Sequence, residues 1–380
     1  MIVPSRLRAS VIAAALGALL LVAACGGNPQ SAATPKSSPT PKQVTVRTGN
    51  PSSPVTLIED GSSLILPYLQ TLVSPLRQAY PNITLAPAAG GSGKGIADAI
   101  AGTVQMGGSD AYLSDAQAQQ NPNLLNIPIA VSSQAVNFNL KGVSSLNLTG
   151  NVLAQIYSGK ITKWNDPAIT KLNPGAKLPD QTIVPIRRVD SSGDTFIFTS
   201  FLSTTNTAWS NGPAFGTTVT WPAVQGELTA SGNPAMVQTC EQTPGSIAYI
   251  GISVEATALS GGLGQAALQN RAGKFVKPTQ QTALAAVAAK ATSIPDDLRA
   301  SLVYAPGDQS YPIVNYEYVM VSSQQKDANT ALALRTFLTW AIDPSGGATS
   351  ANLSTVGFNP LPATVVPKVH TAINKIQASS

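Results

Sequence analysis

The chain has 380 residues, a formal net charge of +5, and charged side chains at only 11% of its positions. No cluster of Lys and Arg stands out, which argues against nucleic acid as a partner. His370 is the only histidine and there are two cysteines. The sequence therefore favours neither a zinc site nor a Ser-His-Asp triad, and we expect no metal and no cofactor.

The N-terminal residues predict export. Arg6 and Arg8 precede a short apolar run at residues 11–24, which is typical of a signal peptide and too short for a comfortable membrane span. The run ends in "LVAACGG", so Cys25 is predicted to carry a lipid. The alternative is an ordinary signal peptide with an incidental cysteine.

These features divide the N-terminal region in two. Residues 1–24 are predicted to be the signal peptide. Residues 25–43 are predicted to be the lipidated cysteine and a linker rich in Pro, Ser and Thr. The expected location is the outer face of the cell membrane.

The rest of the chain begins with strands and helices in alternation. Strands are predicted at 54–60, 82–89 and 104–110, and helices at 66–80 and 95–104. This order predicts an α/β fold with a mainly parallel sheet, in which ligands bind beyond the carboxyl ends of the strands.

Two later stretches are extended and β-rich, residues 125–140 and 311–323. If both cross between two lobes, the first lobe comprises residues 44–127 plus 312–380 and the second comprises 128–311. Two helices are expected in the C-terminal tail, at 327–342 and 366–376.

Four separate turns are built from Ser, Gly and Asp. They are "EDGSSLILP" (59–67), "AAGGSGKGI" (88–96), "MGGSDAYLS" (106–114) and "IRRVDSSGDTFIF" (186–198). Backbone N–H groups at helix starts, hydroxyl donors and a fixed positive charge together suit a small oxyanion. The second turn is not a P-loop, because Ala88 stands where the first glycine belongs and Gly95 where Ser or Thr must bind Mg²⁺.

Arg188 is the predicted positive charge of this site. On an extended segment, Arg188 and Asp190 point to one side and Arg187 to the other. Arg188 and Asp190 are therefore predicted to share a cleft wall, the alternative being a surface ion pair of little energetic value.

Asp110 and Asp194 bear on the choice of anion. An ionised carboxylate only accepts hydrogen bonds, so it favours a ligand that still carries a proton, as phosphate does and sulfate does not at neutral pH. The alternative roles are helix capping for Asp110, dipole compensation for Asp194 and an N-cap for Ser92.

The chain resembles the lipid-anchored phosphate-binding subunit of bacterial phosphate ABC importers from about Thr56 to its C-terminus. The ordered motifs are "GGSDAYLS", "VLAQIYSGKITKWNDPAITKLNPG", "PIRRVDSSGDTFIFTSFL", "TPGSIAYIG" and "YPIVNYEYV". The resemblance implies a two-lobed, type II-like periplasmic-binding-protein fold that closes on one phosphate ion.

The same resemblance implies the site. Its phosphate-contacting residues would be Ser63, Leu64, Ile65, Ser92, Asp110, Arg188, Ser192, Gly193 and Asp194, with Leu64 and Ile65 acting through backbone N–H groups and Arg188 also pairing with Asp110. Many family members have Thr where Asp194 stands. Some relatives have a second cysteine where this chain has Ser246, so Cys240 is expected to be a buried free thiol.

The predicted function is the binding of inorganic phosphate outside the cytoplasm and its delivery to a membrane permease, by a monomer that is not an enzyme. One alternative is a binding protein or sensor for another tetrahedral oxyanion. The other is a phosphate-ester hydrolase with Ser192 as nucleophile, for which His370 is the only histidine base.

Overall fold

The computed structural model describes residues 44–143 and 145–379, which belong to one compact unit. The predicted signal peptide, Cys25 and the linker lie outside the described residues. Within the described ranges, none of the helices combines the length and the hydrophobicity that a membrane span requires.

One mixed sheet forms the centre of the fold, with strand order β2-β1-β3-β12-β4-β8-β6-β7 and β9 beside β4. Its strands are β1 (Val55–Gly61), β2 (Ile83–Ala89), β3 (Met106–Ser109), β4 (Leu124–Phe138), β6 (Val184–Arg188), β7 (Leu228–Ala230), β8 (Ser246–Gly251), β9 (Gly264–Gln265) and β12 (Val314–Ser322). Two small sheets contain β5 (Asn147–Leu148), β10 (Ala267–Gln269) and β11 (Phe275–Val276), and β13 (Gln324–Gln325) and β14 (Gln377–Ala378).

The helices lie against this sheet and at its ends. They are α1 (Leu66–Ala79), α2 (Ser92–Ala101), α3 (Asp115–Gln120), α4 (Gly150–Tyr157), α5 (Pro167–Thr170), α6 (Gly193–Thr205), α7 (Thr207–Asn211), α8 (Gly232–Gln242), α9 (Glu255–Ser260), α10 (Gln280–Ala288), α11 (Ala328–Ala341), α12 (Ser350–Thr355) and α13 (Val366–Ile373). Short 3₁₀ turns lie at η1 (Ile252–Val254) and η2 (Ala291–Ser293).

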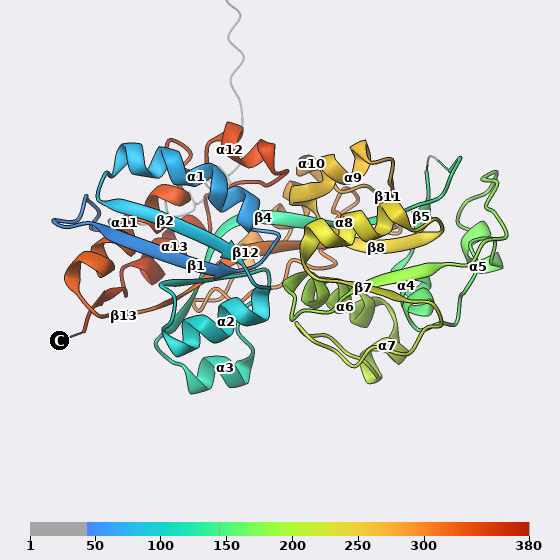
Figure 1. Cartoon of the computed structure of the whole chain (residues 1–380), viewed down its shortest axis with the longest axis horizontal. Coiled ribbons are helices and arrows are strands. Elements are labelled where there is room, and N and C mark those ends of the chain that lie inside the picture. The colour runs from blue at the N-terminus through green and yellow to red at the C-terminus, as the bar shows by residue number, and fades with distance from the viewer. Residues whose placement is uncertain (1–43, 144, 380) are drawn as a thin grey trace, which may run out of the picture. The chain divides into compact units, whose positions relative to one another are not determined.

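Strands β4 and β12 connect two lobes. The first part of β4, residues 124–133, pairs with β12, and its last part, residues 134–138, pairs with β8. Figure 1 shows β4 and β12 between the elements around α1, α2 and α11 and those around α6 and α8. The observed architecture is the predicted two-lobed α/β fold.

The sheet is not mainly parallel, which corrects one prediction. Strand β1 pairs in parallel with β2 and β3, and β6 pairs in parallel with β7 and β8. Strands β4 and β12, however, pair antiparallel with all their neighbours in this sheet. The reason is topological, because the chain passes between the lobes on β4 and returns on β12.

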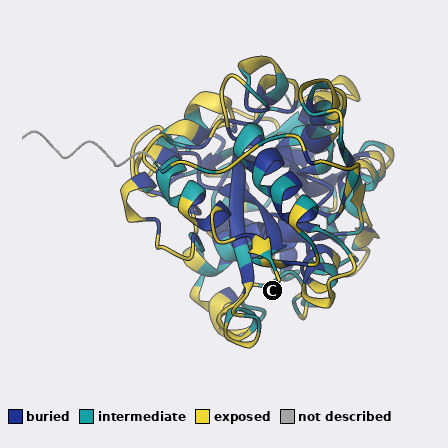
Figure 2. Cartoon of the chain, turned by 90° about the vertical axis from the view of Figure 1, so that its left-hand side faces the viewer, coloured by how far each residue is buried: buried dark blue, intermediate teal, exposed yellow. Residues whose placement is uncertain are grey.

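The first two helices show why the sequence folds locally as it does. Pro67 lies in the first turn of α1, where its missing N–H costs nothing, and one face of the helix is buried through Tyr68, Leu69, Leu72 and Leu76. Helix α2 begins at Ser92, earlier than predicted, and ends before Gly102, which adopts a left-handed conformation with φ of 69°. Figure 2 shows the strands buried at the centre and the outward faces of the helices exposed.

Candidate functional site

Three predicted turns meet at the carboxyl ends of β1, β3 and β6. The turn after β1 carries Ser62 and Ser63, β3 is followed directly by Asp110, and β6 ends in Arg188. Helices α2 and α6 begin at the same place, with Ser92 and Gly193 as their first residues. Strands β1 and β3 run in parallel in one lobe, whereas β6 in the other lobe runs in the opposite direction, so the carboxyl ends of both sets face the seam between the lobes.

Arg188 is the charged centre of this group. Its side chain is 1% exposed, and its Nε donates to Asp190 Oδ1 at 2.7 Å while Nη1 donates to Asp194 Oδ2 at 2.8 Å. Nη2 makes a further ion pair with Asp190. Burial lowers the pKa of Arg188, but the hydrogen bond that Arg188 donates to Asp190 and the charges of Asp194 and Asp190 outweigh it and raise the pKa above its ordinary value. Arg188 therefore remains a fixed cation.

The predicted opposite orientations of residues 187 and 188 are confirmed. Arg187 lies on the other side of β6, where its Nη2 donates to Glu227 at 2.8 Å and its guanidinium lies 5.9 Å from the ring centroid of Trp221. The expected pair between Arg188 and Asp110 is not the one observed, since the ion pairs of Arg188 run to Asp190 and Asp194. These two carboxylates follow Arg188 in the same turn and reach it without a contribution from the other lobe.

Asp194 is held by three different elements. Besides Arg188, its Oδ2 accepts from Asn233 Nδ2 on α8 at 2.7 Å, and its Oδ1 accepts from Gln134 Nε2 on β4 at 3.0 Å. Burial raises the pKa of Asp194, although the charge of Arg188 and these hydrogen bonds oppose the rise. With both oxygens occupied, Asp194 orients Arg188.

Asp110 lies in the first lobe and is 2% exposed. Its Oδ1 accepts a hydrogen bond from the hydroxyl of Ser62, and its Oδ2 accepts one from Ser92 Oγ at 3.3 Å. Burial and then the charge of Asp194 raise the pKa of Asp110 to about 7. The hydroxyl of Ser92 serves Asp110 and caps no helix, because α2 has no side-chain cap.

Asp110 is not a helix cap either. The N-cap of the following helix, α3, is Ser114, which forms a capping box with Gln117. The carboxylate of Asp110 is therefore free of a local backbone role and faces the other site residues.

The first turn contacts the second lobe through Ser63. Its Oγ accepts from the backbone N of Asn233 at 3.0 Å and from Asn233 Nδ2 at 3.2 Å. The N–H groups of Leu64 and Ile65 point to Ser62 Oγ, at 2.9 Å and 3.3 Å. Ser62, which the sequence analysis did not select, thus links this turn to Asp110.

The turn before α6 contacts the first lobe through its backbone. Ser191 O accepts from Gly93 N at 3.0 Å, and Ser192 caps α6 by accepting from Thr195 N at 3.4 Å. A Cβ placed on Gly193 would lie 2.5 Å from Ser92 Oγ and closer still to Asp110 Oδ2. Only glycine permits this approach of the two lobes.

Several residues of the site were missed by the sequence analysis: Ser62, Gln134, Asn233 and Glu317. Glu317 is buried on β12, and burial and the charge of Asp110 raise its pKa. Asn233 follows a Ser-Gly pair like those of the selected turns, which was a usable signal. Gln134 and Glu317 occur inside extended apolar stretches, and nothing local to them indicates a site.

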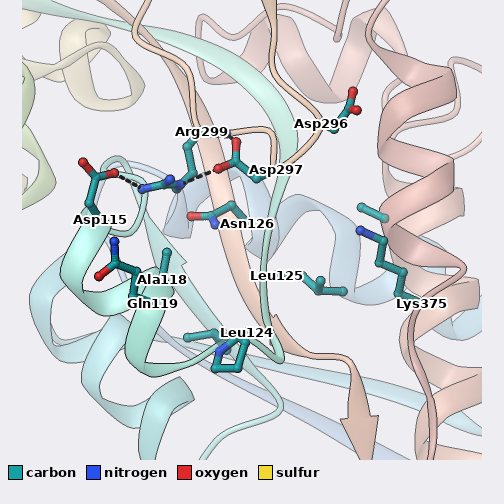
Figure 3. Close-up of a pocket in the computed structure, with 12 residues that line it drawn as sticks. Asp115, Ala118, Gln119, Leu124, Leu125, Asn126, Asp296, Asp297, Arg299 and Lys375 are labelled. Carbon is teal, nitrogen blue, oxygen red and sulfur yellow. Dashed lines mark hydrogen bonds and ion pairs between the residues drawn. The ribbon is translucent and has the colours of Figure 1, made fainter.

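A separate cavity of about 340 Å³ lies between α3, the 296–299 segment and α13. Figure 3 shows Arg299 directed at Asp115 and Asp297, with bonds of 2.7 Å and 2.8 Å. Asp296 is paired with Lys368 at 2.8 Å. The charges around this cavity largely neutralise one another, and its lining includes none of the predicted anion-binding residues.

Comparison with known proteins agrees with this architecture. Residues 47–345 match the PBP superfamily domain. The phosphate-binding protein PstS of Methanocaldococcus jannaschii is 32% identical over 360 residues, which cover 87% of this chain and 88% of that protein. The phosphate-binding protein PstS of Xylella fastidiosa is 34% identical over 281 residues, covering 73% of this chain and 74% of that protein.

A solved structure shows the same fold. The phosphate-binding protein from Stenotrophomonas maltophilia has a TM-score of 0.63 and 18% identity to this chain, covering 84% of this chain and 93% of that one. The fold and the seam between the lobes define a two-lobed binding protein. The chain belongs to the PBP superfamily and, within it, to the family of phosphate-binding proteins named PstS.

Proposed function

We propose that this protein binds inorganic phosphate outside the cytoplasm and delivers it to the permease of an ABC importer. Its relatives are named phosphate-binding proteins. The observation that carries the proposal is a buried arginine at the seam of two lobes, with the start of α6 facing the hydroxyl of Ser92 and the carboxylate of Asp110, which can accept a hydrogen bond from the ligand.

Arg188 keeps hydrogen-bonding capacity for an anion. Three of its five N–H groups are used by Asp190 and Asp194, so two remain. The hydroxyls of Ser63 and Ser192, which act as acceptors in their observed hydrogen bonds, and the N–H groups at the start of α6 are further donors at the seam. The binding residues proposed are Ser63, Leu64, Ile65, Ser92, Asp110, Arg188, Ser192, Gly193 and Asp194.

Closure of the two lobes would complete this site. The proposed first lobe is 44–127 plus 312–380 and the second is 128–311, joined by β4 and β12. Ligand contacts from both lobes favour the closed arrangement, so phosphate would bias a hinge motion by its higher affinity for that state.

The site supports binding without chemistry. The hydroxyl of Ser192, which a hydrolase would need as nucleophile, accepts the N-cap hydrogen bond from Thr195. His370 lies on α13 near the backbone of Val44 and not beside Ser192. In the described part of the chain, no group of three or more His, Cys, Asp or Glu residues is placed to hold a metal ion.

The proposed protein is a monomer anchored to the outer face of the membrane through a lipid on Cys25. The support is the sequence around Cys25, since that residue lies outside the described ranges. The linker at 25–43 would let the lobes reach a permease while the anchor keeps them near the membrane.

Calorimetric titration with phosphate, arsenate, sulfate and molybdate tests the proposed ligand. We expect phosphate to bind tightly and arsenate, which also keeps a proton at neutral pH, to compete with it. Sulfate and molybdate should bind far more weakly. Tight sulfate binding with no measurable phosphate binding would contradict the proposal.

A further inference from the structure

Glu317 is a buried carboxyl directly behind the proposed ligand-facing Asp110. It lies on β12 and is 0% exposed. Strand β12 pairs antiparallel with β3, with Tyr318 opposite Ser109, the last residue of β3, and Glu317 and Asp110 are the residues that adjoin this pair. The two buried carboxyls lie close enough to interact, because, besides burial, the charge of Asp110 raises the pKa of Glu317 and a hydrogen bond from Glu317 lowers that of Asp110.

One carboxyl oxygen of Glu317 accepts hydrogen bonds, and the other receives none. Its Oε1 accepts from the hydroxyl of Ser132 and from Asn315 Nδ2 at 2.9 Å. Its Oε2 is buried, and no donor from the described residues reaches it. Two ionised carboxylates only accept hydrogen bonds, so a hydrogen bond between Glu317 and Asp110 requires one proton on one of them.

The charges around the pair indicate which carboxyl holds that proton. Arg188 is the single cation of the group and faces Asp190, Asp194 and Asp110, where its charge favours the ionised form. Glu317 faces Asp110 and the neutral side chains of Ser132 and Asn315. Burial, and then the charge of Asp110, raise the pKa of Glu317 well above its ordinary value.

We propose that Glu317 is protonated at neutral pH and donates its hydrogen bond to Asp110, so that Asp110 presents an ionised acceptor to the ligand. Glu317 is then a positioning residue that acts through Asp110, and it helps to determine which anion binds. This inference rests on the proposed phosphate function. Its physical basis is that a donor behind Asp110 favours the charged form of that carboxylate, whereas an ionised Glu317 would add a fourth negative charge to those of Asp110, Asp190 and Asp194 and oppose anion binding.

Two substitutions test whether Glu317 acts as a neutral hydrogen-bond donor or as an ionised carboxylate. Glu317→Gln keeps a neutral donor for Asp110 and an acceptor for Ser132 and Asn315. Glu317→Leu removes both the donor and the acceptor and leaves a side chain of similar volume. The affinities of wild type and both variants for phosphate and sulfate are measured by calorimetry at pH 7, with Glu241→Gln on α8 as a matched control outside the site.

We expect Glu317→Gln to retain phosphate affinity within about threefold of wild type. Glu317→Leu should lose at least about tenfold and narrow the preference for phosphate over sulfate, because Asp110 loses a hydrogen bond to its charged form. An equal loss in both variants, or no loss in Glu317→Leu, overturns the inference.

Infrared difference spectroscopy measures directly whether the carboxyl group of Glu317 is protonated. The spectrum of wild type minus Glu317→Gln should show the carbonyl band of a protonated carboxylic acid, and the difference spectrum for Glu241→Gln serves as the control. An ionised signature for Glu317 overturns the proposal. This measurement needs no ligand. If wild type fails to bind phosphate, that result contradicts only the proposed function, and the infrared spectrum still tests whether Glu317 is protonated. The spectrum likewise tests the proposal if the Glu317→Leu variant does not fold.

Discussion

Arg188 and Arg187 are neighbours in sequence with opposite environments. Arg188 has a 1% exposed side chain at the seam, whereas the side chain of Arg187 is 24% exposed and pairs with Glu227. A desolvated, charge-assisted hydrogen bond to an anion contributes about 1.5–3 kcal/mol. Arg188→Ala should therefore weaken phosphate binding by at least about tenfold in calorimetry, and Arg187→Ala much less. Similar losses in the two variants would contradict this assignment.

Asp110 is the residue expected to distinguish phosphate from sulfate. A carboxylate aimed at the ligand accepts a hydrogen bond from a protonated oxygen and repels an unprotonated one. Asp110→Asn removes the charge and supplies donors, so the ratio of phosphate to sulfate affinity should fall by at least about tenfold. Competitive titration of both anions at pH 7 measures the ratio. An unchanged ratio would place the selectivity in other residues.

From the buried carboxyl of Glu59 we predict that the stability of the protein depends on pH, with or without a bound ligand. It is 0% exposed on β1, and burial raises its pKa to about 8 from an ordinary value of 4.5. Between these two values the folded state holds a proton that the unfolded state has lost, so stability falls as the pH rises. The slope from this group is at most about 1.4 kcal/mol per pH unit.

Glu59→Gln removes this titrating group. The free energy of unfolding of the variant should therefore rise relative to that of wild type as the pH increases from 5 to about 8. Urea denaturation at several pH values measures the difference, with Glu241→Gln as the control. A constant difference across this range would show that Glu59 is ionised in the folded protein.

At the scale of elements, the start of α6 determines how closely the lobes approach. A Cβ on Gly193 would overlap Asp110 and Ser92 of the other lobe. Such overpacking costs about 1–3 kcal/mol. Gly193→Ala should therefore weaken phosphate binding by about tenfold or more and leave the protein more open in small-angle scattering with saturating phosphate.

Gly212→Ala at the end of α7 is the control for Gly193→Ala, because its added Cβ would lie 3.1 Å from Ala208 O and away from the seam. An unaltered phosphate affinity in Gly193→Ala would mean that the lobes close without this contact.

The periodic elements were predictable because each depends on residues close in sequence. The strand–turn–helix units of β1, α1, β2 and α2 follow from alternating apolar residues, from Pro67 and from Gly102. The direction of the crossing strands was not predictable in this way. An apolar run such as that of β4 is compatible with either parallel or antiparallel neighbours.

For the whole molecule, Cys25 is predicted to determine where the protein resides. A lipid on Cys25 would hold the folded lobes at the membrane through the 25–43 linker. Cys25→Ala should release the protein into the soluble fraction after cell fractionation, with phosphate affinity unchanged. Persistent membrane attachment after cleavage of the signal peptide would contradict the anchor.

The thiol of Cys240 is a second property of the whole chain that the sequence anticipated. Cys240 is a free, buried cysteine, with Ser246 Oγ 3.2 Å from its Sγ. Burial raises the pKa of this thiol to about 11, so it is a poor nucleophile in the folded protein.

By itself the sequence determined the α/β class, the four Ser/Gly turns and the side of β6 on which Arg188 lies, and it carries the prediction of an export signal. These depend on composition and on short-range periodicity, which act within a few residues. Only the tertiary structure decided that Ser62 rather than Ser63 binds Asp110, and that Arg188 pairs with Asp194. It also brought Gln134, Asn233 and Glu317 to the site, because strand register and lobe contact, which join residues far apart in the chain, place their side chains.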